Sequence, residues 1–144
     1  MHTDLARDML QTLFKIIGLK QQVIVSISEN ELSVTDINSR KIELRPRISK
    51  HSRSIIGDFN AVEKELKSLM SSVFPRQWVY TEVIIVLSGQ NQGGYTAVER
   101  RAARELAYGA TGAHVVYISE LPVSNDQAAR VFKGEKIEHE LSDA

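Results

Sequence analysis

The first pattern along the chain is a repeat of apolar residues with the period of a helix, over residues 3–17. Leu5, Met9 and Leu13 follow one another at intervals of four residues, and Leu10 widens the same stripe. These side chains therefore share one side of a helix. The spacing predicts an amphipathic helix at the start of the chain.

Three strand-like segments come next, at 23–27, 32–37 and 42–48, and Val23, Val25 and Ile27 of the first alternate with its other residues. The links between them are short and polar, which is typical of antiparallel neighbours in a meander. A helical period then returns at 58–74 and stops before Pro75, because the residue before a proline avoids helical geometry.

Strands and helices alternate in the second half of the chain. A continuous apolar run at 79–87 suits a strand that is covered on both faces. A helix is expected at 96–108 with Gly109 as its end, followed by a strand at 115–118 and a short helix at 121–133. This order predicts an α/β fold in which a three-strand meander precedes β-α-β crossovers, giving a mixed five-stranded sheet with helices on its faces.

The pattern corresponds to one domain at 21–134, preceded by a helical segment at 1–20 and followed by a charged tail at 135–144. No apolar run reaches the roughly 20 residues that cross a bilayer. The N-terminus also lacks the features of a secretory signal. We therefore expect a cytoplasmic protein.

Composition argues against two classes of site. Eighteen basic residues balance eighteen acidic ones, so no overall positive charge attracts nucleic acid. The chain has no cysteine, and its four histidines are not spaced like metal ligands. We therefore expect neither a nucleic-acid partner nor a metal site.

Residues 96–105 read TAVERRAARE, which closely resembles the pattern T-x-V-E-R-R-A-x-R-E of the MreB-type bacterial actin homologues. Residues 112–117 (GAHVVY) match the family's G-A-x-x-V-[FY], and residues 55–66 are similar to its G-V-I-A-D-F-x-x-T-E-K-M-L. The similarity is strong over 55–122 and weaker over 13–50. It implies the ribonuclease-H-like first subdomain of the actin superfamily, and a role in rod shape or in the bacterial cytoskeleton.

The resemblance also locates the residues on which nucleotide binding would depend. The family's first phosphate loop, D-L-G-T-A-N-T, corresponds here to a hairpin that contains Ser26, Ser28, Glu29 and Asn30 and has no glycine. Carboxylates at Glu29 and Glu31 occupy the place of phosphate oxygens and repel them. We therefore expect no ATP, no magnesium and no other cofactor.

The family's water-positioning glutamate directly precedes the proline of its E-E-P motif. An ungapped alignment places Leu121 there, and leucine neither orients water nor accepts a proton. Glu120 takes that place only if the register shifts by one residue. The family's second phosphate loop and second lobe are expected beyond residue 144, so no catalytic residue is expected in this chain.

These features favour a non-catalytic, actin-like protein that acts by protein–protein interaction. The alternative is an ATP-binding actin-like protein, an ATPase, whose nucleotide cage is completed by self-association or by a partner chain. A metal-dependent nuclease on the same scaffold is disfavoured because it needs converging carboxylates. The strand carboxylates Glu29, Asp36, Glu43 and Glu82 form no clear cluster in the sequence.

The N-terminal helix is the first candidate for an interaction surface, with Leu13, Phe14 and Ile17 as its candidate residues. It suits packing against the sheet, against a copy of itself or against another protein. The alternative is the surface of the inner membrane, contacted through residues 3–20, because some relatives carry a short amphipathic segment that binds membranes.

The second candidate surface consists of Arg100, Arg101 and Arg104 in the helix that begins at residue 96. One interpretation is a solvated helix face stabilised by local charge pairs. The alternative is a protein contact, since arginine is enriched at interfaces.

Overall fold

The computed structural model of the chain describes residues 2–16, 20–47, 56–74, 79–89, 94–134 and 142–143. In chain order its elements are α1 (His2–Ile16), β1 (Lys20–Ile27), β2 (Glu31–Asp36), β3 (Ile42–Pro46), α2 (Phe59–Val73), β4 (Tyr80–Leu87), α3 (Ala97–Thr111), β5 (Val115–Ser119), α4 (Asn125–Phe132) and β6 (Ser142–Asp143).

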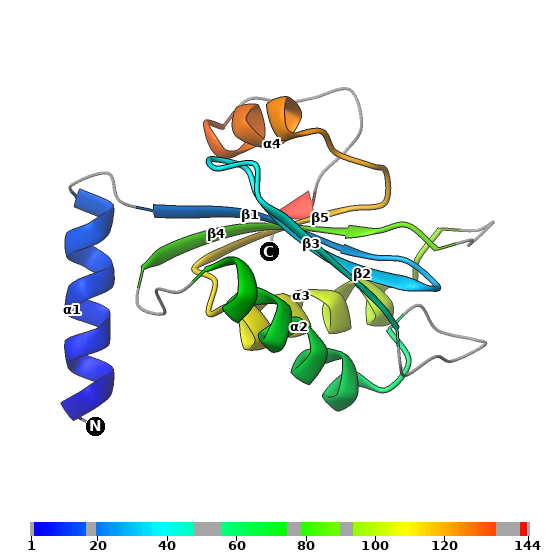
Figure 1. The fold of residues 1–144 in the computed structure, drawn as a ribbon, viewed down its shortest axis with the longest axis horizontal. Coiled ribbons are helices and arrows are strands. Elements are labelled where there is room, and N and C mark those ends of the chain that lie inside the picture. Colours follow the sequence, from blue (N-terminus) through cyan, green and yellow to red (C-terminus); the bar gives the residue numbers. More distant parts are fainter. Residues whose placement is uncertain are drawn as a thin grey trace.

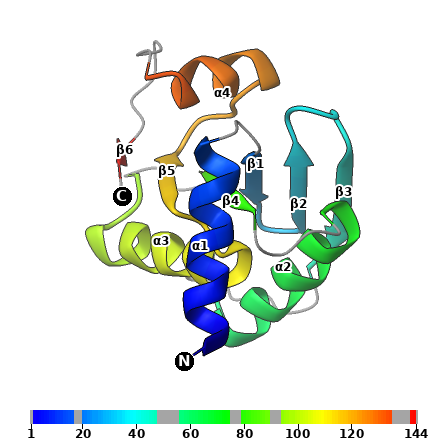
Figure 2. The ribbon, with the colours of Figure 1, turned by 90° about the vertical axis from the view of Figure 1, so that its left-hand side faces the viewer.

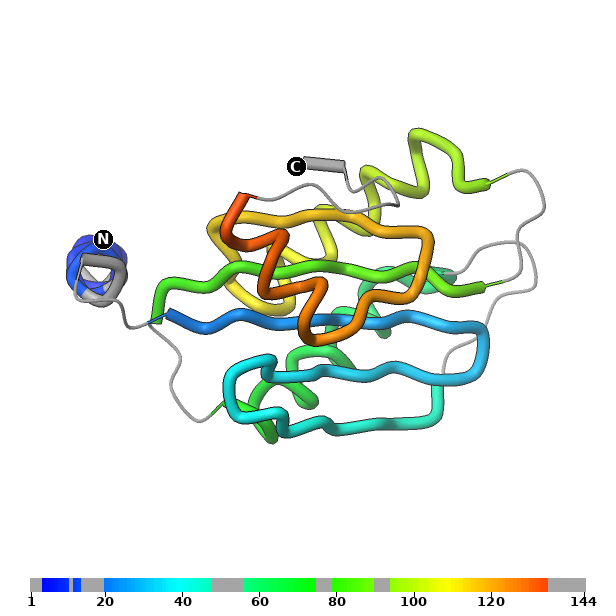
Figure 3. Tube along the Cα trace, turned by 90° about the horizontal axis from the view of Figure 1, so that it is seen from above, coloured from blue at the N-terminus to red at the C-terminus, as the bar shows by residue number. Residues whose placement is uncertain are grey.

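The strands form one mixed sheet in the order β3-β2-β1-β4-β5-β6 (Figure 3). Strands β1, β4 and β5 are parallel, and β2 and β3 continue from β1 as an antiparallel meander. β1 pairs with β4 along its whole length, from Lys20 opposite Tyr80 to Ile27 opposite Leu87. We call the end where the parallel strands begin the amino end of the sheet, and the end where they finish the carboxyl end.

The predicted α/β class and mixed five-stranded sheet, β3-β2-β1-β4-β5, are confirmed, and the arrangement is ribonuclease-H-like. The sequence did not predict β6, which lies in the segment expected to be a charged tail. Ser142 pairs with Ile118 and Asp143 with Tyr117 in antiparallel register. β6 therefore pairs with the outer side of β5 at Tyr117 and Ile118.

Helices cover both faces of the sheet (Figures 1 and 2). α2 and α3 pack on one face, and α4 packs on the other. Alternate residues of β1 divide between the two layers. Val25 belongs to the core with Leu66 and Leu106, whereas Ile24 packs with Val131. β4 is buried on both faces beyond its first residue, which explains its continuous apolar sequence.

Polar side chains cap the starts of the helices on the larger core. Asp58 accepts a hydrogen bond from the N–H of Ala61 at the start of α2. At the start of α3, Thr96 and Glu99 bond to each other's backbone N–H groups in a capping box. Each cap satisfies backbone donors that the helix itself leaves open, so both predicted starts are confirmed.

The predicted end of α3 at Gly109 is wrong. The helix continues to Thr111 and ends at Gly112, whose φ of 69° is left-handed and favours glycine. Gly109 lies instead where α3 meets α2, since a Cβ at this position would collide with the carboxylate of Glu63. Each of the two positions therefore favours glycine for a different structural reason. The spacing of residues in the sequence does not show which glycine ends the helix.

α1 stands apart from the two layers, at the amino end of the sheet (Figures 1 and 3). The helix predicted at 3–17 is confirmed as His2–Ile16. It contacts the body near β4. The turn between β1 and β2 lies at the opposite, carboxyl end (Figure 3).

Candidate functional site

The carboxyl end contains the turn between β1 and β2, where the family resemblance places a phosphate loop. The N–H of Ser28 donates to the carbonyl of Glu31 (2.9 Å), and the N–H of Glu31 donates to Oγ of Ser28 (3.0 Å). Glu29 and Asn30 form the exposed tip, while Ser26 lies within β1 and not in the turn. The turn therefore uses these N–H groups and the Ser28 hydroxyl for its own closure.

Arg47 supports this turn from the end of β3. Its N–H donates to the carbonyl of Asn30 (2.9 Å), and its guanidinium donates to the carbonyls of Ser28 (3.1 Å) and Ile56 (2.8 Å). Only 5% of Arg47 is exposed. This burial lowers the pKa of the guanidinium, and the negative charge of Glu65 opposes the shift. The cation beside the turn is thus engaged by protein carbonyls.

Glu120, the carboxylate that a shifted register would make a candidate base, joins β5 to α3. Its Oε1 accepts a hydrogen bond from the N–H of Tyr95 (2.8 Å), and its Oε2 accepts one from Nη1 of Arg100 (2.9 Å). Bonds of this kind to a charged group are short and comparatively strong. Leu121, at the family's glutamate position, is 51% exposed. This geometry gives Glu120 a structural role, because its carboxylate connects the end of β5 to Tyr95 and Arg100.

Tyr95 closes the loop between β4 and α3. Its hydroxyl accepts a hydrogen bond from the N–H of Gly89 (2.9 Å) and donates one to the Gly89 carbonyl (3.1 Å). Burial raises the pKa of the phenol, although the bond to Gly89 opposes this. The negative charges of Glu120, Glu99 and Glu29 raise the pKa further. The negative charges of three carboxylates thus act on the Tyr95 phenol, and the charge of Glu120 among them is paired with Arg100.

The three arginines of α3 do not form a common surface. Arg100 is engaged by Glu120. Arg101 is exposed and pairs with Glu105 one turn further on, at 3.4 Å. Arg104 is half-buried, and its Nε has no hydrogen-bond partner among the described residues. Only Arg101 therefore fits the interpretation of a solvated helix face.

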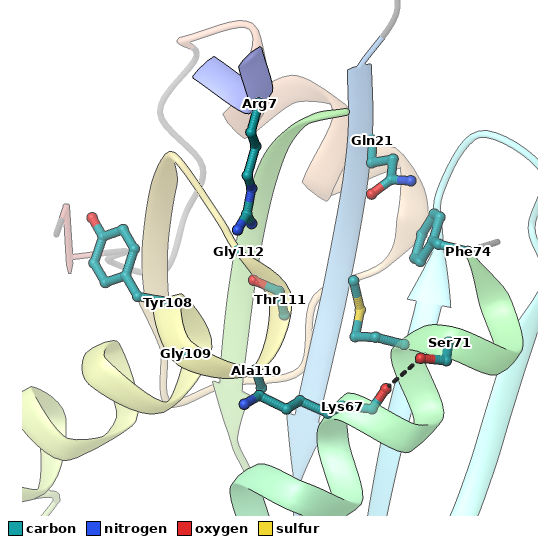
Figure 4. Close-up of a pocket in the computed structure, with 11 residues that line it drawn as sticks. Arg7, Gln21, Lys67, Ser71, Phe74, Tyr108, Gly109, Ala110, Thr111 and Gly112 are labelled. Atoms are coloured by element: carbon teal, nitrogen blue, oxygen red, sulfur yellow. Dashed lines mark hydrogen bonds between the residues drawn. The ribbon is translucent and has the colours of Figure 1, made fainter. Parts of the chain in front are cut away.

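A pocket of about 450 Å³ lies at the amino end, between α1 and the last turns of α2 and α3 (Figure 4). Arg7 of α1 points into it toward Gly112, where a Cβ would lie 2.9 Å from Nη2 of the arginine. Within the described ranges Arg7 makes no hydrogen bond or ion pair. A cation at this place is favoured by the carbonyls at the end of α3.

Three other side chains that line the pocket are polar and already partnered, while Met70 and Phe74 add apolar lining. Lys67 lies 3.6 Å from Glu63 in an ion pair along α2. Ser71 donates to the carbonyl of Lys67, and Thr111 donates to the carbonyl of Ala107. The pocket therefore has a mixed polar and apolar lining, and the guanidinium of Arg7 enters it from α1.

The outer side of α1 exposes large apolar side chains. The exposed fractions are 63% for Leu5, 65% for Met9 and 49% for Leu13. Of the sequence candidates, Leu13 thus lies at the surface. The side chain of Phe14, and Ile17 as a whole, lie outside the described part of the chain. We call Leu5, Met9 and Leu13 the α1 apolar face.

Two general findings limit the chemistry of the described part of the chain. No three His, Asp or Glu side chains in it gather closely enough to bind a metal ion. No helix found there is both long and apolar enough to span a bilayer.

No family model matches the chain. A similar protein is the Escherichia coli (strain K12) protein whose name reads "Uncharacterized protein YjaA". The two chains are 26% identical over 94 residues, which cover 60% of this chain and 74% of the other. This similarity assigns neither a family nor an activity.

Three residues with contacts at the two ends of the sheet were not predicted from the sequence: Tyr95, Arg47 and Arg7. Tyr95 directly precedes the capping threonine of α3, and an aromatic residue beside a glycine-bearing loop was a usable signal. The roles of Arg47 and Arg7 depend on contacts with distant segments, for which the sequence holds no local signal.

Proposed function

We propose that this chain is a non-catalytic, MreB-like protein of the actin superfamily that binds another protein through α1, in cell shape or cytoskeletal assembly. The observation that carries the proposal is the α1 apolar face, whose three side chains are 49% to 65% exposed. Large apolar side chains gathered on a protein surface typically mark a contact with a partner.

The energetics of α1 also favour a partner. An isolated helix of fifteen residues is marginal in water, and among the described residues α1 contacts the body near β4 and at Gly112. Full burial of a Leu or Met side chain contributes about 1.5–3 kcal/mol. Because the three side chains are half exposed or more, a partner groove would gain roughly 3–5 kcal/mol from them.

A protein groove suits α1 better than an anionic bilayer. Asp4 and Asp8 are exposed on the helix, and anionic lipid repels carboxylates. Arg7, which would attract such lipid, points into the pocket (Figure 4). The charges of α1 thus give little attraction to a membrane surface.

The hydrogen bonds at the carboxyl end support the part of the proposal that excludes nucleotide chemistry. The turn at Ser28 is closed by its own hydrogen bonds, and Glu120 is held by Arg100. An ATPase would need these groups free to receive phosphate oxygens and to position water. The resemblance over 55–122 supplies the cytoskeletal context of the proposal.

Co-sedimentation with MreB-type filaments tests the proposal. We expect the chain to pellet with filaments at micromolar concentration. The double substitution Met9→Asp with Leu13→Asp should weaken this association at least tenfold, because it places charge in the centre of an apolar contact.

Val98→Asp is the matched control, because Val98 is 78% exposed on α3 and away from α1. It should leave co-sedimentation unchanged. The proposal fails if the unaltered chain does not associate with filaments, or if the α1 variant binds as well as the control. Flotation with anionic vesicles that is lost in the same α1 variant would assign α1 to a membrane instead.

A further inference from the structure

Within the residues that the structure describes, the outer side of β3 is an open strand edge. β3 pairs with β2 on one side, and no described strand pairs with its other side. At the opposite edge of the sheet, β6 covers β5. An open edge presents unpaired backbone groups that recruit another strand, so β3 is the place where this sheet can extend.

The hydrogen bonds between β2 and β3 identify which residues face outward. The N–H of Asp36 donates to the carbonyl of Lys41 (2.8 Å), and the N–H of Arg47 donates to the carbonyl of Asn30 (2.9 Å). Bonded residues alternate along an antiparallel strand. Residues 41, 43, 45 and 47 therefore bond to β2, and the backbone groups of Ile42, Leu44 and Pro46 point to the open side.

Two large apolar side chains accompany this open edge. Ile42 is 53% exposed and Leu44 is 55% exposed. Both lie on the sheet face that carries α4. The buried cluster under α4 draws on β1, on β4 and on Ile37, which directly follows β2, and it includes no residue of β3. Ile42 and Leu44 therefore border the edge without a covering helix among the described residues.

The sequence of β3 is self-complementary when two copies run antiparallel about Leu44. Leu44 then lies opposite its own counterpart, and Ile42 lies opposite Pro46. On the other face, each Glu43 lies opposite an Arg45 of the second copy. The outward N–H groups of Leu44 and Ile42 would donate to carbonyls of the other strand, whereas Pro46 has no N–H to leave unpaired.

The same residues disfavour slipped registers. A shift by two residues in one direction places Glu43 opposite Glu43 of the second copy. A shift by two in the other direction places Arg45 opposite Arg45. Like charges directly opposite each other destabilise a strand pair, so the two nearest registers that keep backbone bonding are both unfavourable.

We propose that β3 is a homodimerisation edge, on which a second copy of this chain docks antiparallel about Leu44 and extends the sheet across a two-fold axis. This interface is separate from the α1 face on which the proposed function depends. α2 lies beneath β2 and β3, so the two α2 helices would lie side by side. Ser68 and Ser72, which are small and exposed, permit their approach. Because five residues per strand bury less than a standard interface, the dimer should be weak.

Sedimentation equilibrium of the full chain at up to about 1 mM tests this interface. The unaltered chain should dimerise. Glu43→Arg alone and Arg45→Glu alone should each weaken the dimer about tenfold, because each places two like-charged pairs across the axis. The double exchange, Glu43→Arg with Arg45→Glu, should restore it, because opposite charges face each other again. Circular dichroism verifies that each variant is folded.

Leu44→Lys should abolish the dimer, and Val98→Lys, at an exposed apolar position on α3, should leave it intact. A monomeric unaltered chain overturns the proposal, as does a double exchange that does not restore the dimer. The Met9→Asp, Leu13→Asp variant distinguishes the test of partner binding through α1 from the test of dimerisation through β3. This variant should still dimerise. If it does not, self-association occurs through α1 instead of β3.

Discussion

The two ends of the sheet differ in how their polar groups are used. At the carboxyl end, Ser28, Tyr95 and Glu120 are bonded to neighbouring protein groups. At the amino end, Arg7 enters a pocket of about 450 Å³ without a bonded partner in the described part of the chain. α1 beside this pocket exposes its apolar face. The groups named at the carboxyl end are thus closed on one another. The amino end also contains bonded pairs such as Lys20 with Glu82, but it leaves Arg7 and the α1 apolar face open to contact.

This difference indicates where binding can occur. A closed network of hydrogen bonds resists rearrangement, because each group released without a new partner costs about 1–3 kcal/mol. Exposed apolar groups, in contrast, gain free energy when a partner covers them. The contrast favours protein contact at α1 over ligand chemistry at the carboxyl end.

The largest loss of stability should come from Glu120→Ala at the carboxyl end, and Arg7→Ala at the amino end is its counterpart. Glu120→Ala should lower the free energy of unfolding by about 2 kcal/mol, because it leaves Arg100 and the N–H of Tyr95 without their acceptor. Arg7→Ala should lower it by about 0.5 kcal/mol, since the arginine interacts mainly with the end of α3. Urea unfolding measures both.

Glu120→Gln is the matched variant for this comparison. It keeps an acceptor oxygen for the N–H of Tyr95 but removes the charge. Its loss of unfolding free energy should therefore fall between those of Glu120→Ala and Arg7→Ala. Equal effects of Glu120→Ala and Arg7→Ala would contradict the difference between a closed and an open end.

Tyr95→Phe should have the next largest effect. It removes the hydroxyl that bonds to both backbone groups of Gly89, and we expect a loss of about 1 kcal/mol in the free energy of unfolding. The same urea titration measures it at neutral pH. A loss below a few tenths of a kcal/mol would mean that the hydroxyl does not hold the loop.

The raised pKa of Tyr95 also predicts that the stability of the fold depends on pH in the alkaline range. Its pKa is raised in the folded chain above the unfolded value of about 10. The stability that it contributes is therefore fully present below pH 10 and is lost as pH rises through the folded pKa. Comparing the unaltered chain with Tyr95→Phe from pH 9 to 11 should show a smaller decline in the variant. Parallel declines would exclude this linkage.

The regular elements could be predicted from the sequence because their signals are local. The period of the helix at Phe59–Val73 and the apolar run at Tyr80–Leu87 follow directly from the residues. The end of α3 could not be predicted, because Gly109 and Gly112 differ only in tertiary surroundings. β6 was missed for a similar reason, since a two-residue strand depends on the edge of β5.

The candidate site was harder to predict than the fold. The family resemblance pointed to the turn at 28–31, and its acidic, glycine-free character follows from the residues themselves because charge and turn chemistry are local. The bonds from Arg47 to Ile56 and from Arg100 to Glu120 join separate segments, so no local pattern predicts them. The exposure of Leu13 also depends on where α1 lies relative to the body.

We expect that the acidic turn at Glu29 and the Glu120 carboxylate, which Arg100 holds, do not receive a triphosphate. Titration calorimetry of the full chain with ATP and Mg²⁺ tests it most directly. No saturable heat should appear at millimolar nucleotide. Saturable binding that is lost when Ser28 is replaced by a bulky residue would contradict it, because the nucleotide would then occupy the turn that the structure describes as closed.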